Sequence, residues 1–104
     1  MKIPAKESDE KWKEILNAPF ELGRVTITAN ADSALNKPDV DAAIERHKAG
    51  DWGDVSKDDW QQNNEFAKEK EMLLSVYYDS KGTKFWIITD AGHATTTVLL
   101  PSDY

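Results

Sequence analysis

The last third of the chain, from Leu73 to Leu100, follows the period of two that is typical of β-strands. Three segments carry the pattern, LLSVYY, TKFWIIT and TTTVLL, and the turns at 79–82 and 90–93 separate them. Pro101 ends the last segment, since proline does not continue a strand. Strands joined by such short turns pair side by side in opposite directions. The pattern therefore predicts a three-stranded antiparallel meander.

One further strand is predicted ahead of the meander, in the segment 24–28. Its sequence RVTIT alternates strictly, and it places Val25 and Ile27 on the side that we expect to face the core. After it, Asn30 or Asp32 is suited to cap a single helical turn that runs through Leu35.

Two longer helices are predicted between this strand and the meander. The first starts at Asn36-Lys37-Pro38, presents an inner stripe that ends with His47, and stops at Gly50. The second runs from about Lys57 to Lys70, because Ser56 and the carboxylates behind it form a typical helix start.

The expected fold is α+β: an N-terminal helix, a strand, two helices and the meander, in one mainly antiparallel four-stranded sheet with helices on one face. Residues 1–21 are predicted to form a helical extension, and 22–104 a single domain. A chain of 104 residues has room for one core. No apolar run is long enough to cross a bilayer and the N-terminus lacks the pattern of a signal peptide, so we expect a cytoplasmic protein with no membrane contact.

The acidity of the chain is concentrated in one segment. The net charge is −6, and residues 51–71 hold seven acidic and three basic side chains. Such a surface repels phosphate, which disfavours direct nucleic-acid binding and favours a basic or nucleic-acid-binding protein as partner. The partner-binding candidates in this segment are its clustered aspartates, Asp51, Asp54, Asp58 and Asp59.

No cofactor or metal is predicted. The chain has no cysteine, which excludes disulfides, thiol catalysis and cysteine-based metal sites. The aspartates of 51–59 lack the spacing of a calcium loop, and Asp58 and Asp59 suit the first turn of a helix.

Two tryptophans are candidate binding residues. Trp52 stands between two glycines, where it either fills the bottom of the core or anchors a partner. Trp86 lies in FWII, a strand that is apolar on both faces, so something must cover its second face. The N-terminal helix, a second copy of the chain in a homodimer, or a target protein are the three candidates.

The candidate catalytic residues are two histidines and a lysine. His47 lies on the inner stripe of a helix, where a core histidine is the simpler interpretation. His93 follows Asp90 in a turn, where either turn geometry or a reactive Asp/His pair explains it. Lys84 would stabilise phosphate if the chain were a ribonuclease.

The segments AGDWGD at 49–54, TKFWIIT at 83–89 and TVLLPSDY at 97–104 resemble a family of small bacterial proteins often labelled plasmid-related proteins. The resemblance covers most of residues 22–104 and implies a mobile-element context, plasmid or phage. Some members carry the label of a type I restriction methylation subunit. This chain has neither the Asn-Pro-Pro-aromatic motif nor the glycine-rich loop of those enzymes. The family's usual Thr-Glu-Ala-Asp-Arg is TDAGH here, so His93 stands where the family has arginine.

The predicted order of elements is also similar to that of RelE-like ribonuclease toxins. That similarity implies a catalytic role for His47, Lys84 and His93. The leading hypothesis is nevertheless a small acidic protein-interaction module without enzymatic activity, an anti-defence inhibitor of a nucleic-acid-binding host complex. A RelE-like ribonuclease, or a degenerate relative of one, is the alternative.

Overall fold

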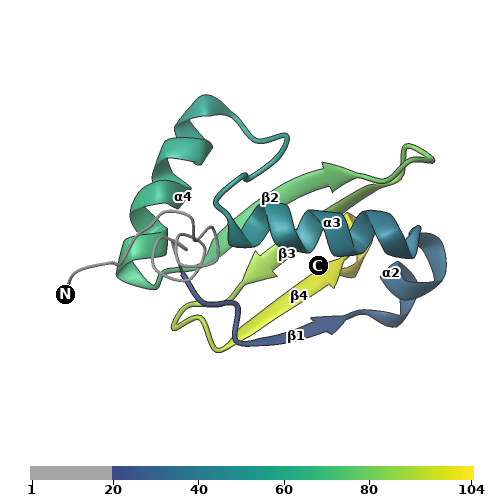
Figure 1. Ribbon diagram of the computed structural model, residues 1–104, viewed down its shortest axis with the longest axis horizontal. Coiled ribbons are helices and arrows are strands. Elements are labelled where there is room, and N and C mark those ends of the chain that lie inside the picture. The colour runs from purple at the N-terminus through teal and green to yellow at the C-terminus, as the bar shows by residue number, and fades with distance from the viewer. Residues whose placement is uncertain (1–19) are drawn as a thin grey trace, which may run out of the picture.

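The computed structural model describes residues 20–104, so nearly all of the predicted N-terminal extension lies outside the described residues. Figure 1 shows the order of the elements. They are β1 (Arg24–Ile27), α2 (Ala29–Ala34), α3 (Lys37–Lys48), α4 (Lys57–Glu69), β2 (Leu73–Tyr78), β3 (Lys84–Thr89), β4 (Thr95–Leu99) and the 3₁₀ turn η2 (Pro101–Asp103). Within residues 20–104, no helix combines the length and the apolar character that crossing a membrane requires.

The four strands form one sheet in the order β1-β4-β3-β2. The meander is antiparallel as predicted, with Val76 opposite Trp86 and Trp86 opposite Leu99. The fourth strand, β1, joins at the edge and runs parallel to β4, with Val25 opposite Thr96. The α+β fold with a mainly antiparallel four-stranded sheet is thus confirmed.

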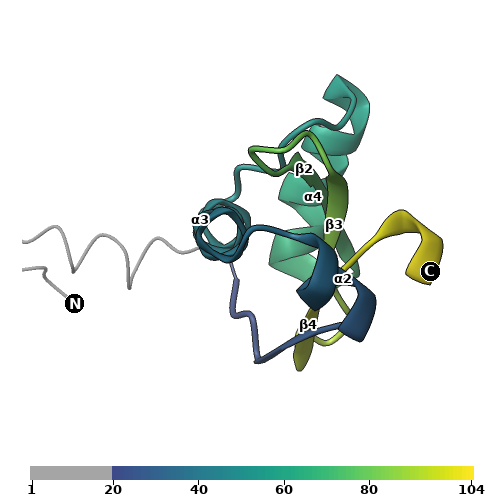
Figure 2. The ribbon, with the colours of Figure 1, turned by 90° about the vertical axis from the view of Figure 1, so that its right-hand side faces the viewer.

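The helices pack on the sheet in two places. α3 crosses one face, and η2 lies on the other side of the sheet (Figure 2). Beneath α3, residues such as Val40, Phe85 and Ile87 form the main core. α4 stands beside the start of β2, at the end of the sheet, and a second cluster around Trp52 and Leu73 fills the space there (Figure 1).

The ends of the long helices follow the sequence closely. The side chain of Asn36 caps α3 and that of Ser56 caps α4. Gly50 follows α3 with a φ of +85°, a conformation that glycine adopts without steric cost. The start of α2 differs from the prediction: its cap is Thr28, whose hydroxyl accepts from the Ala31 N–H, rather than Asn30 or Asp32.

The side chains of Val25 and Ile27 are more exposed than the alternation of β1 predicted. They are 44% and 39% exposed. Because β1 is an edge strand paired with β4 alone, the described elements cover it less than they cover the central strands. The alternation therefore identified the strand, but not its position in the sheet.

Candidate functional site

The residues singled out from the sequence lie in three separate parts of the structure. His47 and His93 are buried near the end of the sheet where α4 stands. The aspartates of the acidic segment 51–71 lie along the loop from α3 to α4 and the start of α4. Lys84 and Trp86 lie on the sheet face turned away from α3.

His47 belongs to a buried chain of hydrogen bonds between α3 and the sheet. Its Nδ1 lies 2.5 Å from the Ser75 hydroxyl, and its Nε2 lies 2.9 Å from the Thr89 hydroxyl. Thr89 continues to Thr96 at 2.7 Å, and the Thr96 hydroxyl donates to the carbonyl of Leu22 at 2.7 Å. The chain thus joins α3 to three neighbouring strands and to the segment before β1.

The last acceptor fixes the direction of every hydrogen bond in this chain. The Leu22 carbonyl can only accept, so the Thr96 hydroxyl donates its one hydrogen to it. Thr96 must therefore accept from the Thr89 hydroxyl. Thr89 in turn accepts from His47, which places the ring proton on Nε2. Nδ1 of the neutral ring is then an acceptor for the Ser75 hydroxyl.

The surroundings keep the His47 ring neutral. Its pKa falls to about 3, because burial disfavours the charged form and because His93 lies nearby. Phe20 and Trp52 contact the ring with their centroids at 5.3 and 5.4 Å. A histidine that is wholly buried with both nitrogens bonded is a structural residue, and no substrate can reach it in this conformation.

His93 is also held by the fold. Its φ is +59° in the β3–β4 turn, its side chain is 6% exposed, and its Nε2–H donates to the carbonyl of Glu71 at 2.8 Å. The link to Asp90 runs through the backbone, from the His93 N–H to the Asp90 carbonyl, and no hydrogen bond joins the two side chains in the described chain. Turn geometry therefore accounts for this pair.

The structure brings the two histidines close together but leaves Lys84 apart. Phe20 lies between the rings, with its centroid 5.3 Å from each. Lys84 is exposed at the start of β3, five residues before Thr89, which is about 16 Å along a strand. The three residues of the ribonuclease hypothesis thus share no open site.

Sequence reasoning missed the partners of His47, which are Ser75, Thr89 and Thr96. The signal was present, since each is a hydroxyl at an inward position of a different meander strand. Buried hydroxyls need partners, so three of them facing one helix favour a polar side chain on that helix.

Asp51 is occupied within the fold. Its carboxylate accepts two hydrogen bonds from the Arg46 guanidinium, at 2.8 and 3.2 Å, and a third from the Gly53 N–H. The bond from Arg46 is the main reason why the pKa of Asp51 lies below its ordinary value. Arg46 also stacks over the ring of Tyr77 at 4.8 Å. Asp51 therefore offers less free charge than its neighbours.

Trp52 is wholly buried, so the structure shows the core role rather than the partner anchor. Its ring stacks on Phe20, with centroids 5.8 Å apart, and its Nε1–H donates to Asn64 of α4 at 2.9 Å. The expectation that Trp52 binds a partner fails for this conformation because no part of its ring reaches the surface.

The other aspartates of the segment are exposed. Asp58 and Asp59 lie in the first turn of α4, after the Ser56 cap, and Asp54 lies in the preceding loop. Asp54 accepts a long hydrogen bond of 3.3 Å from the Tyr78 hydroxyl. Glu65 and Glu69 extend the exposed carboxylates along α4. Within residues 20–104, one ion pair is formed, between Arg46 and Asp51.

Trp86 lies half-buried on the sheet face opposite α3. The Tyr104 ring packs against it edge to face, with centroids 5.7 Å apart. The indole Nε1 is buried and has no hydrogen-bond partner among the described residues. We expected something to cover the second face of β3. Tyr104, which follows β4 in the same chain, covers part of it at Trp86.

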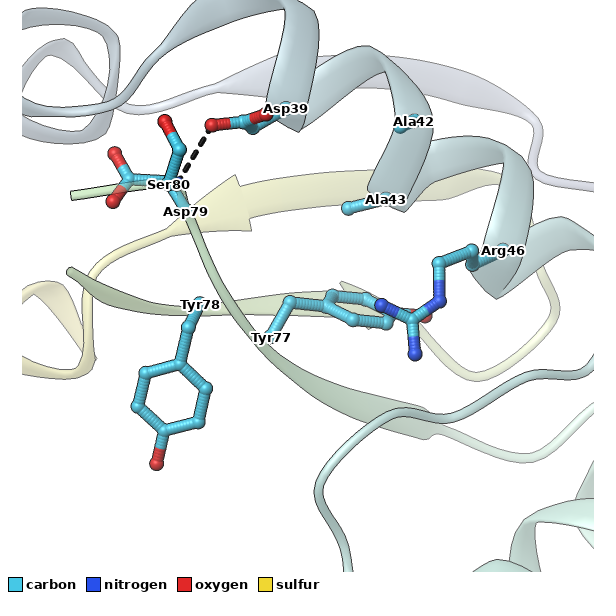
Figure 3. Close-up of a pocket in the computed structure, with 8 residues that line it drawn as sticks. All are labelled: Asp39, Ala42, Ala43, Arg46, Tyr77, Tyr78, Asp79 and Ser80. Atoms are coloured by element: carbon cyan, nitrogen blue, oxygen red, sulfur yellow. Dashed lines mark hydrogen bonds between the residues drawn. The ribbon is translucent and has the colours of Figure 1, made fainter. Parts of the chain in front are cut away.

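An open pocket of about 270 Å³ lies between α3 and the outer edge of β2 (Figure 3). We call it the α3–β2 groove. Its walls are the α3 stripe from Asp39 to Arg46 and the segment 77–80 of β2 and its turn. Asp39 closes one end by accepting from the Ser80 N–H at 2.7 Å, and Arg46 lies toward the other end above Tyr77 (Figure 3).

The described residues contain no cluster of three or more His, Asp or Glu side chains that could hold a metal ion. Comparison of the chain with protein-family models, with curated proteins and with solved structures found no match in any of the three.

Proposed function

We propose that this protein is a non-enzymatic interaction module that presents its acidic segment 51–71 to a basic protein. The partner would be a nucleic-acid-binding component of a host defence complex, which the module inhibits. The resemblance to plasmid-related proteins supplies the mobile-element context of this proposal.

The observation that carries the proposal is the exposure of carboxylates that have no cationic partner in the described chain. Asp58 and Asp59 are exposed at the start of α4 and Asp54 in the loop before it, and the nearest ion pair uses Asp51 instead. Glu65 and Glu69 stand four residues apart on α4, where two like charges repel each other and destabilise a helix by about 0.2–0.5 kcal/mol. A basic partner would relieve that repulsion and would meet the carboxylates in place of phosphates.

The ribonuclease alternative has weaker support. It needs an acid/base residue within reach of RNA, whereas His47 and His93 are buried and bonded and Lys84 lies elsewhere. Expression of the protein without toxicity, and with intact ribosome-bound message, would argue further against it.

The test compares two variants of the full chain in affinity capture from a host lysate. In the first, Asp54→Asn, Asp58→Asn and Asp59→Asn remove the free charges but leave Asp51 to hold Arg46. In the matched control, Asp32→Asn, Asp41→Asn and Glu45→Gln remove three exposed charges from α2 and α3. Wild type and control should capture a basic protein that duplex DNA displaces, and the first variant should lose it. Equal capture by all three proteins would contradict the proposal.

Trp86 is a second proposed contact, on the sheet face that Tyr104 covers in part. A second copy of the chain is another candidate for this face, beside the N-terminal helix. Sedimentation velocity across micromolar concentrations tests for the second copy, since a homodimer shows a mass that rises with concentration.

A further inference from the structure

Within residues 20–104, the outer edge of β2 is paired along part of its length and open along the rest. At Val76, a short parallel segment supplies the partner: the Val76 N–H donates to the Trp52 carbonyl at 3.1 Å, and the Asp54 N–H donates to the Val76 carbonyl at 2.8 Å. The chain then turns away, because the Val55 N–H closes a tight turn onto the Gly53 carbonyl. Residues 52–54 thus pair with β2 at Val76, and after Asp54 the chain no longer lies beside β2.

Tyr78 is the next residue of β2 whose backbone faces this open part of the edge. Backbone groups alternate along a strand, so those of Tyr78 point to the same side as those of Val76. The bond from Asp79 to Thr83 confirms the alternation, since Asp79 turns inward toward β3. Among residues 20–104, no hydrogen-bond partner faces the backbone N–H or carbonyl of Tyr78. The α3–β2 groove lies directly at this open edge.

Carboxylates flank the open edge on both sides of the sheet. Asp39 lines the groove on the α3 side, and Asp54 lies within hydrogen-bond reach of the Tyr78 hydroxyl. Among the described residues of the groove wall, the cation is Arg46, and it is paired with Asp51. The Tyr78 side chain is 51% exposed and adds an aromatic face. The groove therefore favours positive charge.

We propose that the α3–β2 groove binds an extended, basic segment of the partner as an added strand on β2. This inference rests on the proposed function, because it takes the partner to be basic. Main-chain bonds to Tyr78 supply the pairing, as in other complexes in which a peptide extends a sheet. Adjacent side chains of an added strand point to opposite faces, so two consecutive Lys or Arg residues reach Asp39 on one side and Asp54 on the other.

The probe is an acetylated eight-residue peptide of alternating threonine and valine with a central Lys-Lys pair, titrated into the full chain. Binding is followed by fluorescence anisotropy of the labelled peptide and by amide NMR shifts of the protein. We expect the largest shifts at Tyr78 and Ser80. A peptide with a central Glu-Glu pair should bind at least about tenfold more weakly, which corresponds to about 1.4 kcal/mol.

The decisive variants differ in one backbone N–H. Tyr78→Ala removes the ring and keeps the N–H, whereas Tyr78→Pro removes both. Proline is tolerated there because the Tyr78 N–H faces the outer edge of the sheet, and circular dichroism checks that each variant is folded. Tyr78→Pro should weaken binding by about a further tenfold relative to Tyr78→Ala, since a main-chain hydrogen bond is lost.

The outcomes separate this inference from the proposed function. If Tyr78→Pro binds the peptide as Tyr78→Ala does, or if the shifts map to α4, the groove is not the site, while binding of basic partners still stands. The groove proposal is also wrong if the peptide does not bind while the Asn substitutions at Asp54, Asp58 and Asp59 still abolish capture from the lysate. If neither peptide nor lysate protein responds to charge, both proposals are wrong.

Discussion

The hydroxyl oxygen of Ser75 lies 2.5 Å from Nδ1 of His47, and both side chains are wholly buried. Ser75→Ala would leave Nδ1 without a donor in a site that water does not reach. We expect the free energy of unfolding to fall by about 1–3 kcal/mol, which is the cost of a buried unpaired acceptor. Urea denaturation measures the change. Ser80→Ala is the control, because this serine is exposed and its loss should change stability by less than about 0.5 kcal/mol.

Stability should fall as the pH is lowered below about 6.5, because His47 binds a proton more readily in the unfolded chain. Its pKa is about 3 in the fold against an ordinary 6.5, so its contribution is complete above pH 6.5 and lost progressively toward pH 3. We expect a loss of about 2 kcal/mol between pH 7.5 and pH 5.

Urea denaturation at these two pH values checks the prediction, and His47→Gln should flatten the difference. The carboxylates of Asp51 and Asp103, whose pKa values are lowered in the fold, add their own losses only at more acidic pH. An unchanged slope in His47→Gln would show that another group titrates.

Gly53→Ala should destabilise the protein far more than Gly82→Ala, although both glycines have positive φ, +76° and +86°. A Cβ at Gly53 would lie 2.0 Å from the Val76 carbonyl oxygen, whereas none of the other atoms of residues 20–104 lies within 4 Å of one at Gly82. We expect a loss of about 3 kcal/mol or more at Gly53 and about 1 kcal/mol at Gly82. Thermal unfolding of the two variants tests the difference, and similar melting temperatures would contradict it.

Asp103→Ala should loosen the contact between η2 and the sheet. The Asp103 carboxylate accepts from Thr28 at 2.6 Å, from Asn30 at 2.8 Å and from the Leu100 N–H at 3.0 Å, and the bond from Thr28 is the main reason for its lowered pKa. Without these bonds, the indole N–H of Trp86 should exchange with deuterated water several-fold faster. NMR follows this signal, which Trp86→Phe assigns. Unchanged exchange would mean that η2 is held by its apolar contacts alone.

The elements of this fold could be predicted from the sequence because their signals are local. The alternation of 73–100 predicted the meander, and Ser56 and Gly50 marked helix ends that the structure has in the same places. The parallel pairing of β1 with β4 could not be read from the alternation of β1, because it depends on where a distant segment lies. The same dependence explains the exposure of Val25 and Ile27, which follows from the edge position of β1.

The candidate site was harder to predict, for the same physical reason. The partners of His47 come from residues 28 and 42 positions away, and the α3–β2 groove joins α3 to a strand some forty residues later. Trp52 is buried and the aspartates at 54, 58 and 59 are exposed, although all of them lie in one short stretch of the sequence. Exposure is a property of the packed chain, so sequence alone left both roles of Trp52 open.

The pairing of β1 with β4 also constrains how the protein is made. Thr26 meets Thr97 across 71 residues of chain, so β1 leaves the ribosome long before its neighbour exists. β1 cannot pair in the sheet until β4 has been synthesised, and contacts between residues so distant in sequence form slowly. Sheet completion is therefore a late step of folding, and the nascent chain is open to chaperones until β4 emerges.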